Sequence, residues 1–521
     1  MSKICSMDEA LGLIHSGNCI ASSGITMCAV PEEIFKALEK KFLETGEPKD
    51  LTGVFSAGQG NWDDGAWVHL THKGLLKRVV GGHYGSCPKL GDMVSNNELE
   101  AYNLPQGVIL SMFRNAYRGR AGGLSKIGLK TFVDPRQDGG KLNASTTEDL
   151  VSLKEFEGEE WLYYKTPKID VAIIRGSIAD ENGNISLEEE ILPLDMRTVA
   201  MAAKGCGGKV IVQVKHLAKA GSLLSDRVSI PGNMVDAVVL CQDPLQNHRQ
   251  AFDYFYEPSM SGHINVPENS IKPMALTEKK VISRRAAQEL KPGYVVNLGI
   301  GTPEGVSNVA AEEGISSNIV LTAESGVVGG IPVGGKSFGA VQNAWCVVDA
   351  ISQFDFYEGG GLNVTYLGLA QTNKKGDVNV SKFGTKVTGC GGFIDISQTT
   401  KKIVYCGTFT AGGLKIKVGN GKLEILQEGR SKKFVKELQQ VTFSGEFAVE
   451  TNQDVLYVTE RAVFRLTDKG MMLIEIAPGV DLKKDVLGQM EFEPVISPNL
   501  KLMDKRLFEE GLIDLKASMM S

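Results

Sequence analysis

Short apolar runs alternate with amphipathic stretches along most of the chain. Residues 19–21 (Cys-Ile-Ala) predict a short buried strand, and Ser22, Ser23 and Gly24 predict the turn after it. The next helix is predicted to open at residues 31–33 (Pro-Glu-Glu), because proline and acids favour a helix start. Apolar residues then recur at every fourth position, with lysines at the far end. The pattern predicts a strand, a turn and a helix in succession.

The second half of the chain repeats this order of elements. Residues 294–298 (Tyr-Val-Val-Asn-Leu) predict a strand, residues 299–302 (Gly-Ile-Gly-Thr) a turn, and Pro303 the start of a helix. Further segments correspond in the same order, namely 51–58 with 320–326, 171–186 with 364–379, and 207–212 with 401–405. Such a repeat indicates duplication, and alternating strands and helices indicate parallel sheets. We therefore predict an α/β fold of two related open lobes, with mostly parallel sheets covered by helices.

A stretch between the two repeats has no periodic pattern. Residues 242–273 collect Pro, Asn, His and Ser, which is typical of a linker. We expect an N-terminal lobe over residues 1–241 and a C-terminal lobe over residues 274–521. The apolar pattern returns over residues 472–515, which should pack on the second lobe.

Composition narrows the class of protein. Glycine makes up 60 of the 521 residues, above the usual share of about 7%, and indicates many tight turns. The net charge of −6 is too mild for a dedicated nucleic-acid binder. No apolar run reaches the roughly 20 residues that span a bilayer, and Asp8 and Glu9 interrupt any signal peptide. The nine cysteines include no C-x-x-C pair, which excludes a disulfide framework or structural zinc site. We expect a cytoplasmic enzyme without a metal.

The turn at residues 299–305 only partly matches a dinucleotide-binding fingerprint. Its third glycine, Gly305, comes one residue late, Pro303 intervenes, and no suitable acid follows about 20 residues on. NAD binding is therefore disfavoured. The turn is either a plain connection or an anion site, since backbone N–H groups meet at the start of a helix.

Glu324 ends an apolar strand and is followed by a glycine-rich stretch, residues 326–335. Ligands in open α/β folds bind beyond the carboxyl ends of strands, where this side chain is expected. Glu324 is either a functional carboxylate or a structural cap on nearby N–H groups.

A second glycine cluster spans residues 388–395 (Thr-Gly-Cys-Gly-Gly-Phe-Ile-Asp). Consecutive glycines let N–H groups converge, as an oxyanion hole requires. Cys390 lacks a histidine in its half of the chain, since the last one is His263, so a buried structural thiol is favoured over a nucleophile. Residues 354–361 (Phe-Asp-Phe-Tyr-Glu-Gly-Gly-Gly) are either a ligand-facing loop or a tight turn. The histidines interpreted as ordinary polar contacts are His69, His72 and His83.

Together these motifs resemble the family I CoA-transferases, especially the single-chain acetate and propionate CoA-transferases. The resemblance covers essentially the whole chain. Its strongest pieces are residues 131–143, 299–303, 322–326, 354–361 and 389–395. It implies two lobes of the NagB/RpiA/CoA-transferase-like fold, in agreement with the internal repeat.

The resemblance also implies roles for particular residues. Glu324 takes the place of the catalytic glutamate, and the amides of Gly391 and Gly392 face the thioester oxygen. Substrate binding is implied for Gln106, from its Pro-Gln-Gly context, and for Ser23 and Gly24, in a weak version of the family's glycine-rich turn. The implied CoA-binding residues are Gly299, Ile300, Gly301, Thr302, Pro303, Gly389 and Lys415, the last only from its place after residues 411–413.

The implied reaction moves CoA from a short-chain acyl-CoA to a free carboxylic acid such as acetate, propionate or butyrate. It is a ping-pong reaction through a glutamyl-CoA thioester, with CoA as co-substrate and no permanently bound cofactor. A glutamate with an ordinary pKa of about 4.3 is ionised at neutral pH and needs no general base. The expected partners are acyl-CoA and short-chain acids, without nucleic acid or membrane, in a homodimer or homotetramer. The alternatives are an acyl-CoA hydrolase on the same scaffold and a non-catalytic ligand-sensing or scaffold protein.

Overall fold

The computed structural model describes residues 2–267 and 273–520 and contains two compact units. Unit 1 comprises Met1–Val266, Glu324–Asp355 and Ser381–Asp395. Unit 2 comprises Pro267–Ala323, Phe356–Val380 and Ile396–Ser521. In the described part of the chain, no helix is both long and apolar enough to cross a membrane.

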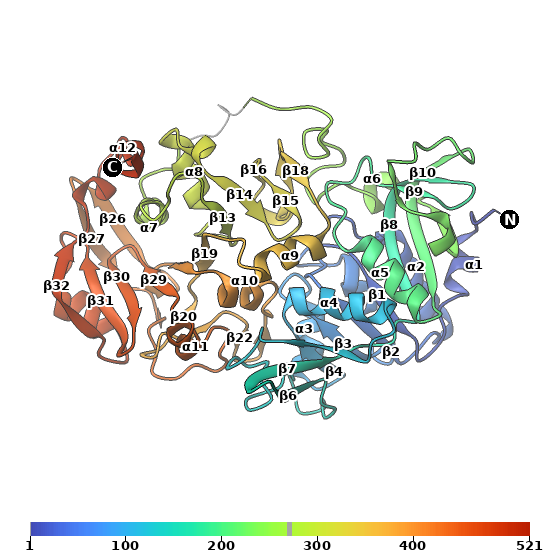
Figure 1. Ribbon diagram of the computed structural model, residues 1–521, viewed down its shortest axis with the longest axis horizontal. Helices are drawn as coiled ribbons and strands as arrows, with labels where there is room; N and C mark the ends of the chain where they lie inside the picture. The colour runs from blue at the N-terminus through green and yellow to red at the C-terminus, as the bar shows by residue number, and fades with distance from the viewer. Residues whose placement is uncertain (1, 268–272, 521) are drawn as a thin grey trace. The chain divides into compact units, whose positions relative to one another are not determined.

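Unit 1 is built on a nine-stranded sheet whose central strands run parallel (Figure 1, blue to green). The strand order is β11-β9-β8-β1-β2-β3-β4, and β10 pairs with β8 and β12. β1 is buried along its whole length and β8 along nearly all of it, as expected for strands covered on both faces. The strands are β1 (Cys19–Ser22), β2 (Leu51–Phe55), β3 (Leu76–Gly81), β4 (Glu100–Asn103), β8 (Val171–Asp180), β9 (Ile185–Ser186), β10 (Lys209–Ala218), β11 (Val228–Ile230) and β12 (Ala237–Leu240).

The first predicted helix of unit 1 begins where the sequence indicates. α2 (Glu32–Thr45) follows Pro31 and stops at Gly46, which has a left-handed φ of 72° that glycine adopts without strain. Its apolar face joins the main core of the unit. A separate antiparallel sheet is formed by β5 (Gly122–Ser125), β6 (Val151–Phe156) and β7 (Glu159–Lys165). The other helices are α1 (Met7–Leu11), α3 (Pro88–Ser95), α4 (Gln106–Tyr117), α5 (Met196–Gly205) and α6 (Pro244–Asn247).

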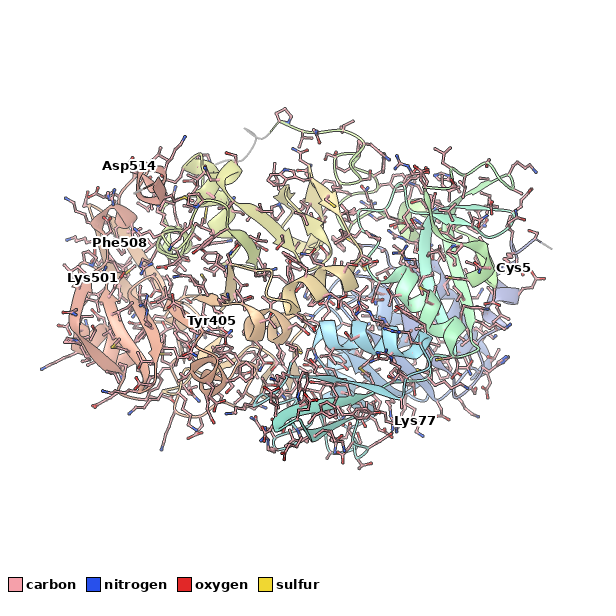
Figure 2. The ribbon with its side chains drawn as sticks, in the orientation of Figure 1. Cys5, Lys77, Tyr405, Lys501, Phe508 and Asp514 are labelled. Atoms are coloured by element: carbon pink, nitrogen blue, oxygen red, sulfur yellow. The ribbon has the colours of Figure 1, made fainter. Side chains whose placement is uncertain are left out.

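Unit 2 contains its own parallel sheet, extended by antiparallel strands at one end (Figure 1). The strand order within the unit is β14-β13-β19-β24-β29-β30-β31-β32. Tyr405 of β24 is buried in this sheet, whereas Lys501 lies on the edge strand β32 (Figure 2). The strands are β13 (Val295–Leu298), β14 (Val320–Ala323), β19 (Val364–Gly368), β24 (Lys402–Cys406), β29 (Asp454–Val458), β30 (Ala462–Thr467), β31 (Gly470–Ile476) and β32 (Val495–Leu502). The helices are α7 (Glu278–Ala287), α8 (Gly305–Glu312), α11 (Gly445–Glu450) and α12 (Leu515–Met520).

The internal repeat is visible in the order of the strands. Unit 1 contains the parallel series β12-β10-β8-β1-β2, and unit 2 contains the parallel series β29-β24-β19-β13-β14. The paired segments of the sequence repeat occupy the same positions in the two series. The predicted α/β fold of two related open sheets is therefore confirmed.

Two segments from the second half of the sequence are bound into unit 1. The backbone N–H of Ala350 donates to the Leu194 carbonyl at 2.9 Å, and Tyr84 N–H donates to the Thr388 carbonyl at 2.7 Å. These long-range hydrogen bonds leave no trace in the local sequence. The compact units thus cut across the boundaries expected from the repeat, which stay a prediction.

The stretch expected to be a ligand-facing loop or tight turn is helical instead. Residues 354–358 belong to α9 (Ala350–Glu358), so both alternatives were wrong for this part. Phe354 and Tyr357 lie three positions apart and are both buried, which is the spacing of one helix face.

The predicted linker, residues 242–273, is irregular but packed over the part that the structure describes. Residues 268–272 lie outside the described residues. His248 is buried, and Gln250 donates to the Glu189 carbonyl at 3.0 Å. This stretch therefore belongs to the fold of unit 1 up to Val266.

Candidate active site

Glu324 leaves the end of strand β14, next to a turn rich in glycine. Its Oε2 atom lies 2.6 Å from where a β-carbon on Gly392 would be, so only glycine admits the carboxyl group there. Among the described residues, none forms a hydrogen bond or ion pair with this carboxyl group. Burial without a compensating donor raises the pKa of Glu324 to about 7.

This pKa corrects one expectation from the sequence. An ordinary glutamate would be fully ionised at neutral pH, whereas Glu324 is about half protonated at pH 7. The reason is desolvation, which penalises the charged form when no cation or N–H group replaces water.

The turn beside Glu324 is held by backbone hydrogen bonds. The N–H of Gly391 donates to the Gly82 carbonyl at 2.7 Å, and Gly389 N–H donates to the Ser381 carbonyl at 2.9 Å. Gly389 and Gly391 have left-handed φ angles of 85° and 52°, which glycine tolerates best. No acceptor within the described chain lies opposite the N–H of Gly392. Of the two amides expected to form an oxyanion hole, that of Gly391 is engaged with Gly82, and that of Gly392 is free of any acceptor in residues 2–267 and 273–520.

Asn103 fixes this turn against the ends of β3 and β4. Its Nδ2 donates to the carbonyls of Gly81 and Gly82 at 2.9 and 2.6 Å. Its Oδ1 accepts from Cys390 N–H at 2.9 Å. Cys390 is buried and burial raises its pKa well above the usual range, which agrees with the predicted structural thiol.

Gln106 begins helix α4 beside the same turn. Its backbone N–H donates to the Gly391 carbonyl at 2.9 Å. The residue is buried, yet its side-chain amide has no hydrogen-bond partner among the residues described. Neither amide atom is fully enclosed, so the side chain is accessible to solvent or to a polar ligand. The predicted substrate-binding residue therefore lies in unit 1 together with Glu324.

Ser23 and Gly24 belong to unit 1 but have structural contacts. The Ser23 hydroxyl donates to the buried carboxyl group of Asp195, which also accepts from Ser56 at 2.6 Å. Burial raises the pKa of Asp195. A β-carbon on Gly24 would lie 2.8 Å from Val30, so this glycine permits close packing. The Ser23 hydroxyl is therefore engaged with Asp195 in this structure.

The residues expected to bind CoA fall into different places. Ile300, Thr302 and Pro303 line a hollow of about 190 Å³ in unit 2, at the end of β13. Lys433 also lines it, donates to the Leu369 carbonyl at 2.9 Å, and has its pKa lowered to about 8 by burial. The other lining residues are Gly368, Leu369, Ala370, Val380, Cys406, Gly407 and Thr408.

The remaining expected CoA-binding residues do not line this hollow. Lys415 is exposed on β26 (Lys415–Gly419), and Gly389 belongs to unit 1. Gly299 and Gly301 belong to the same loop as Ile300, outside the lining of the hollow. The burial and the neighbours of Lys433 could not be read from its Ser-Lys-Lys-Phe context.

The histidines divide into two kinds. His69 contacts Glu32 at 2.9 Å and Glu39 at 2.6 Å, and His72 contacts Glu39 at 2.6 Å, as expected of polar contacts. His83 forms no hydrogen bond with the residues that the structure describes, so its interpretation as an ordinary polar contact was wrong. Within residues 2–267 and 273–520, no cluster of His, Cys, Asp or Glu could hold a metal ion.

Parallel α/β units whose strands end at glycine-rich loops define the chain as an open α/β protein, a class that binds ligands at these strand ends. Comparison with known proteins identifies the family within this class. The sequence pattern described as coenzyme A transferase matches residues 4–240. The caffeate CoA-transferase of Acetobacterium woodii is 45% identical over 514 residues, covering 98% of both chains. The acetate CoA-transferase YdiF of Escherichia coli O157:H7 is 46% identical over 475 residues, covering 91% of this chain and 89% of that one.

Solved structures agree with these sequence matches. The apoenzyme of the acyl-CoA transferase YdiF from Escherichia coli O157:H7 has a TM-score of 0.93 at 43% identity, covering 98% of this chain and 97% of that one. A thioester complex of YdiF with CoA has a TM-score of 0.92 at 42% identity, with the same coverage. The chain therefore belongs to the coenzyme A transferase family. It is an enzyme that transfers CoA between an acyl-CoA and an acid, as the resemblance implied.

Proposed function

We propose that this enzyme transfers CoA between short-chain acyl-CoAs and free carboxylic acids through a covalent thioester on Glu324. The observation that carries the proposal is a carboxyl group beside Gly392, half-buried and without a hydrogen-bonding partner among the described residues. A structural cap would be hydrogen-bonded to nearby N–H groups, whereas a nucleophile must be free to attack. The YdiF thioester complex with CoA supports an adduct of this kind.

The first half-reaction begins with ionised Glu324. A carboxylate oxygen attacks the thioester carbonyl, the carbon–sulfur bond breaks, and the CoA thiolate leaves a mixed anhydride. The thiolate then attacks the glutamyl carbonyl and displaces the original acid as its carboxylate. The enzyme now carries CoA as a glutamyl thioester, and a second carboxylate reverses both steps. Each step exchanges one acyl bond for another, so no oxidant or ATP is needed.

The amide of Gly392 would stabilise the tetrahedral intermediates of these steps. Each intermediate places negative charge on the former carbonyl oxygen, and a fixed N–H donor lowers its energy. Losing one such donor typically costs about 3–4 kcal/mol of barrier. Gly392 has the only free amide of the turn's two central glycines, because Gly391 is bonded to Gly82.

The hollow in unit 2 is the proposed site for part of CoA. β13 and β14 are parallel neighbours within unit 2, with Asn297 opposite Thr322, and the loop after β13 contributes Ile300, Thr302 and Pro303 to the hollow. The hollow combines apolar side chains with hydroxyl and backbone groups and one cation, Lys433. CoA contains a long pantetheine chain and negatively charged phosphates, and such a lining can bind both parts. Binding energy gained far from the thioester can then lower the barrier at the reacting carbon.

Short-chain acids are proposed as substrates because the acetate CoA-transferase YdiF is a full-length relative. The caffeate CoA-transferase is equally similar to this chain, so aromatic acids are the alternative class of acceptor. A kinetic test uses acetyl-CoA as donor with acetate, propionate, butyrate and caffeate as acceptors. Parallel lines in double-reciprocal plots and a preference for the short acids support the proposal. Intersecting lines, or thiol release at the same rate without any acid, contradict it and favour a sequential transferase or a hydrolase.

A further inference from the structure

The side chain of His83, in unit 1, is half-buried and has no role in the reaction scheme above. It follows β3 by two residues, in the segment before α3. The imidazole forms no hydrogen bond with any residue of the described chain. Burial lowers the pKa of His83 to about 4, so the ring is neutral at physiological pH.

The ring of His83 is packed between three glycines. A β-carbon on Gly58 would lie 2.6 Å from its Nδ1, and one on Gly85 would lie 2.8 Å from its Cε1. A β-carbon on Gly391 would lie 4.0 Å from its Cδ2. Side chains at Gly58 and Gly85 would displace the ring, so these two glycines leave the space that it occupies, whereas Gly391 is in ordinary contact with it.

This packing places His83 at the same turn as Glu324. Its Cδ2 edge lies beside Gly391, and the next residue, Gly392, contacts the Glu324 carboxyl group. Gln106 contacts the turn too, through its hydrogen bond to the Gly391 carbonyl. The ring of His83 and the backbone of Gln106 therefore border one turn, and neither residue's side chain has a hydrogen-bond partner among the described residues.

We propose that His83 is a substrate-binding residue whose Nε2–H donates a hydrogen bond to the carboxylate of the acid that accepts CoA. Nε2 lies between Cε1, which faces Gly85, and Cδ2, the ring atom nearest Gly391, whereas Nδ1 is turned toward Gly58. A β-carbon on Gly85 would lie 3.3 Å from Nε2, so the glycine at this position leaves Nε2 accessible. A neutral donor suits this position because a positive charge on the ring, beside the turn that Glu324 contacts, would stabilise the carboxylate and weaken the nucleophile. This inference rests on the proposed function and adds a determinant of acid binding to it.

The test compares His83→Gln with His83→Met in the full-length enzyme. Glutamine places an N–H donor near the position of Nε2, and methionine has the same length without one. The enzyme is first loaded as the glutamyl-CoA thioester, and the rate of CoA return is then measured against propionate concentration. We expect methionine to raise the half-saturating propionate concentration about tenfold, the effect of one lost hydrogen bond, and glutamine to raise it less than about threefold. Inhibition by free CoA should stay unchanged in both variants.

The exposed His15→Met serves as the matched control and should behave as the unmodified enzyme. Equal propionate dependence in the Gln and Met variants overturns the inference, because the ring would then act by packing alone. A second measurement uses the unmodified enzyme. The NMR signals of its histidine rings are recorded while propionate is added. A His83 signal that does not move at saturation also overturns it. An unmodified enzyme that never forms the thioester removes the proposed function as well, so the two failures are distinguishable.

Discussion

Replacing Glu324 with glutamine removes an ionisable group while keeping the size and shape of the side chain. In the folded enzyme burial raises the pKa of Glu324 from 4.5 to about 7. As the pH rises, the unfolded chain loses this proton first, near pH 4.5, and the folded chain loses it later, near pH 7. Between these values the folded state binds more protons, so stability falls as the pH rises. Above pH 7 the full cost of burying the carboxylate is present.

The magnitude follows from the same difference. At 1.36 kcal/mol per pH unit, the raised pKa of Glu324 lowers the free energy of unfolding by about 3 kcal/mol at pH 8 and by about 1 kcal/mol at pH 5.5. Glu324→Gln should therefore be more stable than the unmodified enzyme by these amounts, while CoA transfer is lost. Urea unfolding followed by tryptophan fluorescence at the two pH values measures the difference.

The matched control is Glu44→Gln, an exposed glutamate of α2 whose nearest cation is Lys40 at 3.9 Å. It should change stability by less than about 0.5 kcal/mol at either pH. The reasoning is refuted if Glu324→Gln is no more stable than the unmodified enzyme at pH 8. It is also refuted if the stability difference is the same at pH 5.5 and pH 8.

Ionisation of Glu324 should also govern the first half-reaction. The rate of thioester formation from acetyl-CoA, measured by stopped flow, should fall about tenfold per pH unit below pH 6 and level off above pH 8. A rate that does not change with pH would contradict this. Gly392→Ala should slow transfer at least 100-fold, because its β-carbon would lie 2.6 Å from Glu324 Oε2, whereas Gly91→Ala, with nothing nearer than 3.5 Å, should have normal initial rates. Lys433→Met should raise the inhibition constant of free CoA about tenfold, and the neighbouring Lys432→Met should leave it unchanged; equal constants would remove Lys433 from the CoA site. Glu190→Gln should destabilise the fold by about 3–5 kcal/mol, since it leaves the buried Arg175 without its carboxylate, and a loss below 1 kcal/mol in urea unfolding would disagree.

The elements of the fold could be read from the sequence because their signals are local. The apolar run at β13 and the proline before α2 each determine a strand or a helix start within a few residues. Helix α9 was missed because its glycine-rich end, residues 359–361, resembles a loop. The grouping of Glu324–Asp355 with unit 1 depends on long-range hydrogen bonds, such as that from Ala350 to Leu194.

Residues of the candidate site could be predicted only where a single local motif identifies them. Glu324 stands out because an acid ends an apolar strand before glycines. The state of its proton, with a pKa of about 7, depends on which groups surround it, and these come from distant segments. His83 and Asn103 were missed for the same reason, since their role depends on the turn at Gly391, about 300 residues further along the chain.

The central claim is that CoA is held on the Glu324 side chain between the two half-reactions. The direct measurement is to mix the enzyme with acetyl-CoA, reduce the thioester with borohydride, digest the protein and sequence the peptides by mass spectrometry. The account predicts that the glutamate at position 324 is converted to an alcohol, that no other glutamate is, and that free acetate added beforehand prevents the change by discharging the enzyme. An unreduced Glu324 in an enzyme that still transfers CoA at its full rate would contradict it.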